Sequence, residues 1–174
     1  PLTALLTAME TVADQARPPT LYMGSAPASA LLPDFPAANP APGTPAGVEP
    51  RLWIGNATTI QTHHDHADNI ACAVGGQRVF TLFPPEQVAN LYVGPLDFTP
   101  AGQPISLVQF DRGDWRSDWP RFDAAAEAAR HAVLEPGDAV YIPSLWWHHV
   151  QATATLSMLV NYWWTVGPVG APSP

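Results

Sequence analysis

The sequence Thr62-His63-His64-Asp65-His66-Ala67-Asp68-Asn69 follows a predicted β-strand and is dense in metal-ligating side chains. Side chains alternate along a strand, so His63 and Asp65 are expected to face one side, opposite to His64 and His66. His63 and Asp65 offer an imidazole and a carboxylate. With one distant histidine they would form the two-histidine, one-carboxylate triad of non-haem iron(II) oxygenases. This pair therefore predicts an iron site with open positions opposite the protein ligands.

The other face of the same stretch offers an alternative metal pair. His64 and His66 resemble the opening of the ordinary cupin metal motif, which continues with a glutamate a few residues later. Residues 68–71 contain no glutamate. We therefore favour His63 and Asp65, and we expect His64 and His66 to lie on a polar outer face.

A source for the distant histidine lies near the end of the chain, in the sequence Trp146-Trp147-His148-His149-Val150. It follows a clear turn, Glu135-Pro136-Gly137-Asp138, and a β-like run. In a jelly roll the strand that carries these histidines can be a neighbour of the strand that carries His63. The residue pattern by itself leaves both His148 and His149 open as the third ligand.

Short β-like runs separated by turn residues dominate the chain after residue 50. They cover residues 52–55, 58–64, 70–75, 78–83, 131–134, 139–142, 148–152 and 156–164. Many short strands at close spacing predict an all-β sandwich or barrel with minor helices. Those minor elements are a turn near residues 85–91 and a helix over 121–130. Residues 97–120, rich in Gly, Pro and Trp, are expected to form an insertion over one mouth of the barrel.

The first fifty residues are expected to pack on this barrel. Apolar residues at helical spacing predict an amphipathic helix over residues 2–15, followed by a short strand at 20–23. Residues 24–50 are dense in Pro, Ala and Gly and predict an extended, partly disordered loop. The expected organisation is one domain with an N-terminal part (1–50), a barrel (51–166) interrupted at 97–130, and a tail (167–174).

Composition excludes several classes of function. A chain of 174 residues with 47% hydrophobic content can bury one core. The net charge of −8, with arginine as the only basic residue besides histidine, disfavours a nucleic-acid partner and excludes lysine chemistry. Cys72 is the single cysteine, so no internal disulfide forms.

No apolar run is long enough to span a membrane, and we expect a soluble, cytoplasmic protein. The start at Pro1, without methionine, is compatible with a piece of a longer protein.

Seven motifs occur in order between Tyr22 and Trp164, and together they resemble the cupin-like branch of the JmjC oxygenases. They are Trp53-Ile54-Gly55-Asn56, His63-x-Asp65-x-x-x-Asn69, Gly76-Gln77-Arg78, Leu82-Phe83-Pro84-Pro85, Glu135-Pro136-Gly137-Asp138-Ala139-Val140-Tyr141-Ile142-Pro143, Trp146-Trp147-His148-His149-Val150 and Asn161-Tyr162-Trp163. The resemblance implies a double-stranded β-helix, or jelly roll, that holds Fe(II) and uses 2-oxoglutarate as co-substrate. It favours His148 over His149 as the third iron ligand, because the family ligand directly follows the tryptophan pair.

The resemblance also implies a co-substrate pocket. Arg78 stands where the family has a basic residue, commonly lysine, that pairs with the distal carboxylate of 2-oxoglutarate; an arginine can do so through two hydrogen bonds. Tyr22 matches a tyrosine whose hydroxyl shares that carboxylate. Asn69 and Asn161 match amides that line the co-substrate, although both are equally compatible with ordinary satisfaction of buried backbone groups.

Two positions depart from the family pattern. A hydroxyl residue that the family often places three before the first iron ligand is Ile60 here, so either Thr59 or Thr62 is left to replace its contact, and we favour Thr62. Gly24 stands where peptide-asparagine hydroxylases of the family have a glutamine that grips the substrate. That specificity therefore does not carry over to this chain.

The expected activity is hydroxylation of a protein side chain or a small molecule with O2, releasing succinate and CO2. Demethylation instead of hydroxylation stays open, as does the oligomeric state. One alternative is a non-catalytic metal-binding cupin that serves as a ligand-binding or assembly module. Another is a cupin isomerase that uses His64 and His66.

Overall fold

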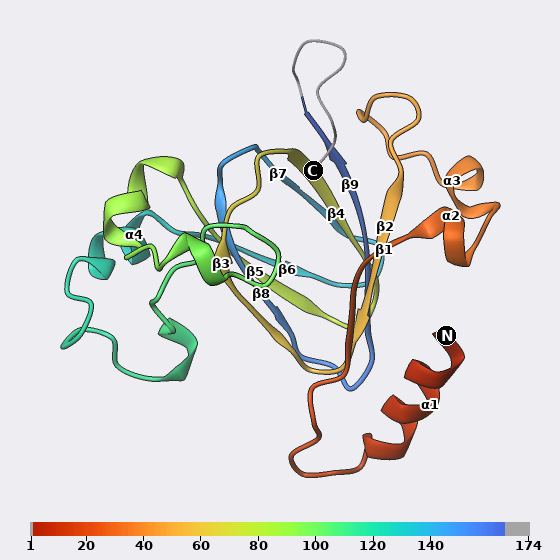
Figure 1. Ribbon diagram of the computed structural model, residues 1–174, viewed down its shortest axis with the longest axis horizontal. Helices are drawn as coiled ribbons and strands as arrows, with labels where there is room; N and C mark the ends of the chain where they lie inside the picture. Colours follow the sequence, from red (N-terminus) through yellow and green to blue (C-terminus); the bar gives the residue numbers. More distant parts are fainter. Residues whose placement is uncertain (1, 166–174) are drawn as a thin grey trace.

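The computed structural model describes residues 2–165 and consists mainly of two antiparallel β-sheets (Figure 1). The larger sheet has the strand order β1 (Tyr22–Pro27), β2 (Pro50–Gly55), β9 (Ser157–Trp164), β4 (Asp68–Gly75), β7 (Ala139–Ile142). The smaller sheet has the order β3 (Thr59–His63), β8 (Trp147–Ala152), β5 (Arg78–Phe83), β6 (Arg130–Leu134). The proposed tail, residues 167–174, and residue 166 lie outside the described residues.

The hydrophobic core lies between the two sheets. Its buried residues come from both of them: Ala71, Ala73, Ile142 and Leu159 from the larger sheet, and Phe80, Leu82, Leu134 and Val150 from the smaller one. Alternation along each strand turns these side chains inward, and each large apolar side chain contributes about 1.5–3 kcal/mol when fully buried. The predicted all-β jelly roll with minor helices is confirmed.

The predicted elements correspond closely to the observed ones, with one correction. The predicted helices over 2–15 and 121–130 are α1 (Leu2–Val12) and α4 (Phe122–Ala128), and the turn near 85–91 is η1 (Pro85–Asn90). The predicted extended loop over 24–50 is wrong in part, because it contains α2 (Ala28–Leu31) and α3 (Phe35–Ala38). Apolar side chains of these two short helices pack against the outer face of the larger sheet, which stabilises them despite the prolines. None of the helices in the described part combines the length and apolarity needed to cross a bilayer.

A β-bulge in β3 shapes the region that holds the histidines. Ile60 pairs with Val150 and His63 pairs with His148, so Gln61 and Thr62 together stand opposite a single residue of β8. Unbroken alternation from Ile60 would turn His63 to the other face of the sheet. The bulge instead lets both Ile60 and His63 face the interior.

The segment predicted as an insertion packs against the outer face of the smaller sheet. It lies at the end of the barrel where His63 ends β3. It contains η2 (Leu96–Phe98) and η3 (Phe110–Arg112), and it shares a second hydrophobic cluster with Phe83, Phe122 and Trp147. Ile105 forms an isolated β-bridge with His63. The insertion is thus held directly beside the strand that ends at His63.

Candidate metal centre and anion pocket

Three side chains from different parts of the chain converge at one end of the barrel. His63 ends β3, Asp65 follows in the connection to β4, and His148 lies on β8 opposite His63. One ligand atom from each residue lies within 4.8 Å of the others, and the two imidazole rings are 4.2 Å apart. This is the one such group of three His, Cys, Asp or Glu side chains within residues 2–165.

Backbone carbonyls orient both imidazoles for metal binding. Nδ1 of His63 lies 2.8 Å from the carbonyl oxygen of Gln61, and Nδ1 of His148 lies 3.0 Å from that of Trp146. A carbonyl only accepts hydrogen bonds, so each Nδ1 carries the proton and donates it. Each Nε2 is then left with its lone pair free, as a metal ligand requires.

The carboxylate of Asp65 lacks compensation for its burial. Its Oδ2 is buried, has no hydrogen-bond partner among residues 2–165, and lies 3.6 Å from Nε2 of His148. Burial raises the pKa of Asp65, although the nearby His63 acts to lower it. Burial also lowers the pKa of His148 well below its ordinary value. Two imidazoles oriented through Nδ1, beside a buried carboxylate oxygen without a hydrogen bond, form a donor set that fits a divalent cation, which would supply the missing positive charge.

The other three histidines of the two motifs lie away from this cluster. The ring of His64 packs edge-on against Trp147 at 4.6 Å, and His66 is exposed. His149 is buried beneath the insertion, on the opposite face of β8 from His148. Its Nε2 lies 3.9 Å from a carboxylate oxygen of Asp111, and neither atom has a hydrogen-bond partner in the described part of the chain.

A narrow cavity runs between the sheets from the metal-ligating histidines toward the other end of β5. Its lining residues are Tyr22, Trp53, Ile60, His63, Asn69, Ala71, Arg78, Phe80, His148, Val150, Leu159, Asn161 and Trp163. Leu82 of β5 pairs with His148, whereas Arg78 pairs with Ala152 at the far end of the strand. The two candidate ligands His63 and His148 and the side chain of Arg78 therefore lie at opposite ends of one cavity.

Arg78 is a buried cation without an anionic partner. It is 3% exposed, its Nε donates to Oγ of Ser157 at 2.9 Å, and its Nη2 donates to the carbonyl oxygen of Trp53 at 3.4 Å. Within the described residues no carboxylate lies within 4.0 Å of the guanidinium. Burial lowers the pKa of Arg78 and raises the pKa of the neighbouring Tyr22 to about 12. A buried charge left unpaired is costly, so this end of the cavity suits a bound anion.

The two asparagines form a hydrogen-bonded pair on one wall of the cavity. Nδ2 of Asn161 donates to Oδ1 of Asn69 at 3.2 Å, and Nε1 of Trp53 donates to Oδ1 of Asn161 at 2.6 Å. The Nε1 group of Trp163, on the same cavity, is buried and has no hydrogen-bond partner in the described part of the chain. The wall thus combines an ordered amide pair with an unused donor.

Thr62 stands apart from the other residues that the sequence indicated. Its side chain is fully buried but does not line the cavity, and its hydroxyl has no hydrogen-bond partner in the part of the chain described. Ile60 occupies the cavity wall instead. Sequence reasoning missed Ser157, the partner of the guanidinium, since nothing in a strand sequence marks that contact. The sequence indicated Trp53 only as a member of the motif Trp53-Ile54-Gly55-Asn56 and predicted no contact for its side chain.

Comparison with known proteins adds independent information. The family model of the cupin-like domain matches residues 1–168. Jumonji C domain-containing protein 5 of Drosophila melanogaster is 32% identical over 122 residues, which cover 70% of this chain and 29% of that protein. Lysine-specific demethylase JMJ31 of Arabidopsis thaliana is 32% identical over 114 residues, covering 65% of this chain and 20% of that protein. tRNA wybutosine-synthesizing protein 4 of Neurospora crassa is 30% identical over 110 residues, which cover 63% of this chain and 9% of that protein. The chain therefore spans less than a third of the length of these relatives.

Proposed function

Because the chain belongs to the family of cupin-like domains, in its JmjC-type branch, we propose that it is an Fe(II)- and 2-oxoglutarate-dependent oxygenase. The observation that carries this proposal is the pairing of two features in one cavity. His63 and His148, which form with Asp65 a cluster that fits a divalent metal, lie at one end, and a buried arginine with no carboxylate within 4.0 Å among the described residues lies at the other. A dicarboxylate that reaches from a metal to a guanidinium satisfies both ends.

In this proposal His63, Asp65 and His148 hold the iron. Arg78 binds the distal carboxylate of 2-oxoglutarate, and Tyr22, neutral at ordinary pH because its pKa is about 12, donates its hydroxyl hydrogen to the same group. Asn69 and Asn161 line the co-substrate along its length. Thr62 is left out of this set, since its side chain does not line the cavity.

The bound metal would supply the redox chemistry. In the overall reaction 2-oxoglutarate is oxidatively decarboxylated to succinate and CO2, one oxygen atom of O2 entering succinate and the other entering a C–H bond of the substrate. The protein residues position the reactants and exclude water. Trp53, Ile60 and Trp163 surround the cavity with apolar surface, and the fixed imidazoles keep their Nε2 atoms toward the metal.

We propose a protein side chain or a small molecule as the substrate, with hydroxylation as the reaction. The relatives carry names as different as a demethylase and a tRNA-modifying protein, so the family does not define the substrate. A net charge of −8 disfavours a polyanionic nucleic acid. The same oxygen insertion into an N-methyl group would release the methyl carbon and would be observed as demethylation.

Anaerobic titration tests the proposal. Addition of 2-oxoglutarate to the Fe(II)-loaded protein should produce a visible charge-transfer band, and admission of O2 should yield succinate. His63→Ala should lose both signals. His66→Ala, which removes an exposed histidine from the same stretch, should retain them.

Two other outcomes would contradict the proposal. Stoichiometric metal binding without a charge-transfer band would support a non-catalytic cupin module. Loss of the metal in His66→Ala, together with its retention in Asp65→Ala, would support an isomerase-type site built from His64 and His66.

A further inference from the structure

Trp53 of β2 contacts four residues that line the cavity, two through hydrogen bonds and two through its ring. Its Nε1 donates to Oδ1 of Asn161 at 2.6 Å, and its carbonyl oxygen accepts from Nη2 of Arg78 at 3.4 Å. Its ring packs against Tyr22, with ring centroids 6.1 Å apart, and edge-on against Trp163 at 5.5 Å. The indole of Trp53 thus connects the ring of Tyr22 with the amide pair, while its backbone carbonyl oxygen bonds the guanidinium.

The hydrogen bond from Trp53 sets the direction of the amide pair. An indole N–H only donates, so the group of Asn161 that faces Trp53 must be its carbonyl oxygen. Nδ2 of Asn161 then points to Oδ1 of Asn69. This leaves Nδ2 of Asn69 as the end of the chain of hydrogen bonds, with no protein partner within residues 2–165. The pair therefore has one free amide donor, Nδ2 of Asn69, and Asn69 lines the cavity.

Without the indole donor the orientation of Asn161 would no longer be determined. The oxygen and nitrogen of an amide have nearly the same shape, so Asn161 could rotate by half a turn and accept from Asn69 instead. The carbonyl oxygen of Asn69 would then face the cavity. An acceptor in that position repels a carboxylate, whereas a donor binds it.

We propose that Trp53 is the positioning residue of the pocket and that it acts through Asn161, by holding both amides with their donors toward an anionic ligand. That this ligand is 2-oxoglutarate rests on the proposed function. Trp53 itself need not touch the ligand for this role.

Two neighbouring glycines make room for the arrangement. A Cβ atom at Gly24 would lie 3.0 Å from a ring carbon of Tyr22 and 3.1 Å from a ring carbon of Trp53. A Cβ atom at Gly55 would lie 2.8 Å from another ring carbon of Tyr22 and 2.9 Å from the carbonyl oxygen of Leu21. Larger residues at either position would displace Tyr22, and at Gly24 also Trp53. Gly24 thus has a packing role at the position where related hydroxylases use a substrate-gripping side chain.

The test uses Trp53→Phe, which removes the N–H donor and keeps an aromatic ring in place. Calorimetric titration of the Mn(II)-loaded protein with 2-oxoglutarate measures co-substrate affinity without turnover. We expect this affinity to fall about tenfold, the effect of losing one buried hydrogen bond that orients a binding group. Affinity for Mn(II) and the melting temperature of the metal-free protein should change little, which separates this effect from misfolding.

A double-mutant cycle separates positioning from packing. If Trp53 acts through Asn161, Trp53→Phe should cause no further loss of 2-oxoglutarate affinity in an Asn161→Ala background. Trp115→Phe is the matched comparison, because it removes an indole N–H that donates to Asp123 at 3.3 Å and does not line the cavity. Its effect should be less than about threefold, below the tenfold expected for Trp53→Phe.

Equal losses in Trp53→Phe and Trp115→Phe, or additive losses in the cycle, would overturn the positioning role. If the wild-type protein binds Mn(II) and 2-oxoglutarate while Trp53→Phe binds both equally well, only this inference fails. If the wild-type Mn(II) protein binds no 2-oxoglutarate, the proposed function and the inference fail together.

Discussion

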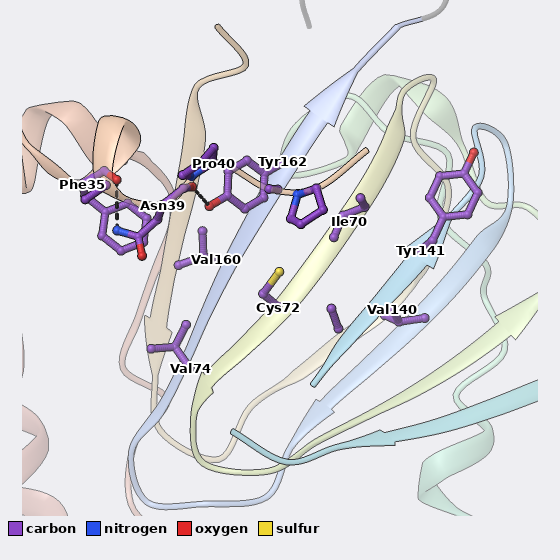
Figure 2. A pocket seen from close by; sticks show the side chains of 14 residues that line it. Phe35, Asn39, Pro40, Ile70, Cys72, Val74, Val140, Tyr141, Val160 and Tyr162 are labelled. Atoms are coloured by element: carbon purple, nitrogen blue, oxygen red, sulfur yellow. Dashed lines mark hydrogen bonds between the residues drawn. The ribbon is translucent and has the colours of Figure 1, made fainter. Parts of the chain in front are cut away.

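The cavity between the sheets and a groove on the outside of the larger sheet are separated by a single layer of strands, yet their chemistry differs. Figure 2 shows the groove, which lies between the outer faces of β4, β7 and β9 and the loop that follows α3. Its volume is about 680 Å³, against about 60 Å³ for the inner cavity. Consecutive residues of one strand serve the two sites: Asn161 lines the cavity, while Val160 and Tyr162 line the groove.

Polar atoms distinguish the two sites more clearly than size does. In the groove the phenol of Tyr162 donates to the carbonyl oxygen of Asn39 at 2.7 Å, and that of Tyr141 donates to Asp68 at 2.7 Å. In the cavity Arg78 has no carboxylate within 4.0 Å among the described residues, and Oδ2 of Asp65, beside His148 of the cavity, has no hydrogen-bond partner among them. Buried groups that remain unpaired in a folded protein indicate a ligand, because their desolvation is otherwise uncompensated.

The largest expected effect concerns the metal. Asp65→Ala should reduce metal affinity by more than about 100-fold, beyond the loss typical of residues that only support a ligand. The same change should leave the unfolding free energy of the metal-free protein unchanged or raise it by about 1 kcal/mol, because an uncompensated buried carboxylate is removed. Metal titration and denaturant unfolding measure the two quantities.

Asp68→Ala is the matched control for this change. Asp68 accepts hydrogen bonds from the hydroxyl of Tyr141 and the backbone N–H of Ser144. Its loss should lower stability by about 1 kcal/mol and keep the metal. Retention of metal by Asp65→Ala would remove the distinction drawn between cavity and groove.

The second effect concerns the anion end of the cavity. Arg78→Leu should weaken 2-oxoglutarate binding to the Mn(II)-loaded protein by about 100-fold or more, as when one partner of a buried ion pair is removed. Arg78→Lys should weaken it by about tenfold, since a lysine keeps the charge but loses the contacts to Ser157 and Trp53. Calorimetry measures both affinities, and metal affinity should stay constant.

Arg51→Leu provides the comparison for the guanidinium. Arg51 lies on β2 but does not line the cavity, and its Nη1 donates to the carbonyl oxygen of Ser25. Its removal should leave 2-oxoglutarate affinity unaltered. Similar losses in the Arg51 and Arg78 variants would show that general charge, not the cavity, attracts the co-substrate.

Much of the fold could be predicted from sequence, because alternation and turn residues are local signals. All eight β-like runs after residue 50 became strands, since their apolar side chains could alternate into one core. The two short helices in the Pro-rich segment could not be predicted, because they depend on packing against the outer face of β2 and β9. Propensity alone gives proline-rich sequence no reason to become helical.

The sequence predicted that His63 and Asp65 lie together, but the structural reason given for it, strand alternation, is only partly right. Simple alternation placed them on one face of a continuous strand, but β3 ends at His63, and Asp65 lies in the connection beyond it. The bulge at Gln61 and Thr62, which turns His63 inward after Ile60, depends on pairing with β8 and has no local signature. Ser157 escaped prediction for the same reason: its partner is distant in the sequence. The chemical roles of all these residues stay predictions.

A smaller effect is expected in the groove. Tyr162→Phe removes the hydrogen bond to Asn39 and should lower the unfolding free energy by about 1 kcal/mol, measured by urea denaturation. The affinity for 2-oxoglutarate should not change, although Tyr162 directly follows Asn161. A clear loss of that affinity would show that the strand layer does not separate the two sites.

The smallest effect at neutral pH, and the most local, concerns Tyr22. Burial raises its pKa from the ordinary value of 10.0 to about 12, although Arg78 acts in the opposite direction. The folded-state pKa lies above the unfolded one, so the corresponding stability is fully present below pH 10 and is lost as the pH rises toward 12. Relative to Tyr22→Phe, the wild-type protein should therefore lose stability only in that alkaline interval. The difference in ultraviolet absorbance between the two proteins should titrate near pH 12. Ionisation of Tyr22 should add no pH dependence to the affinity for 2-oxoglutarate between about pH 6 and 9. A titration near pH 10 would mean that water reaches the phenol freely, so that the anion end of the cavity would be as open to solvent as the groove outside.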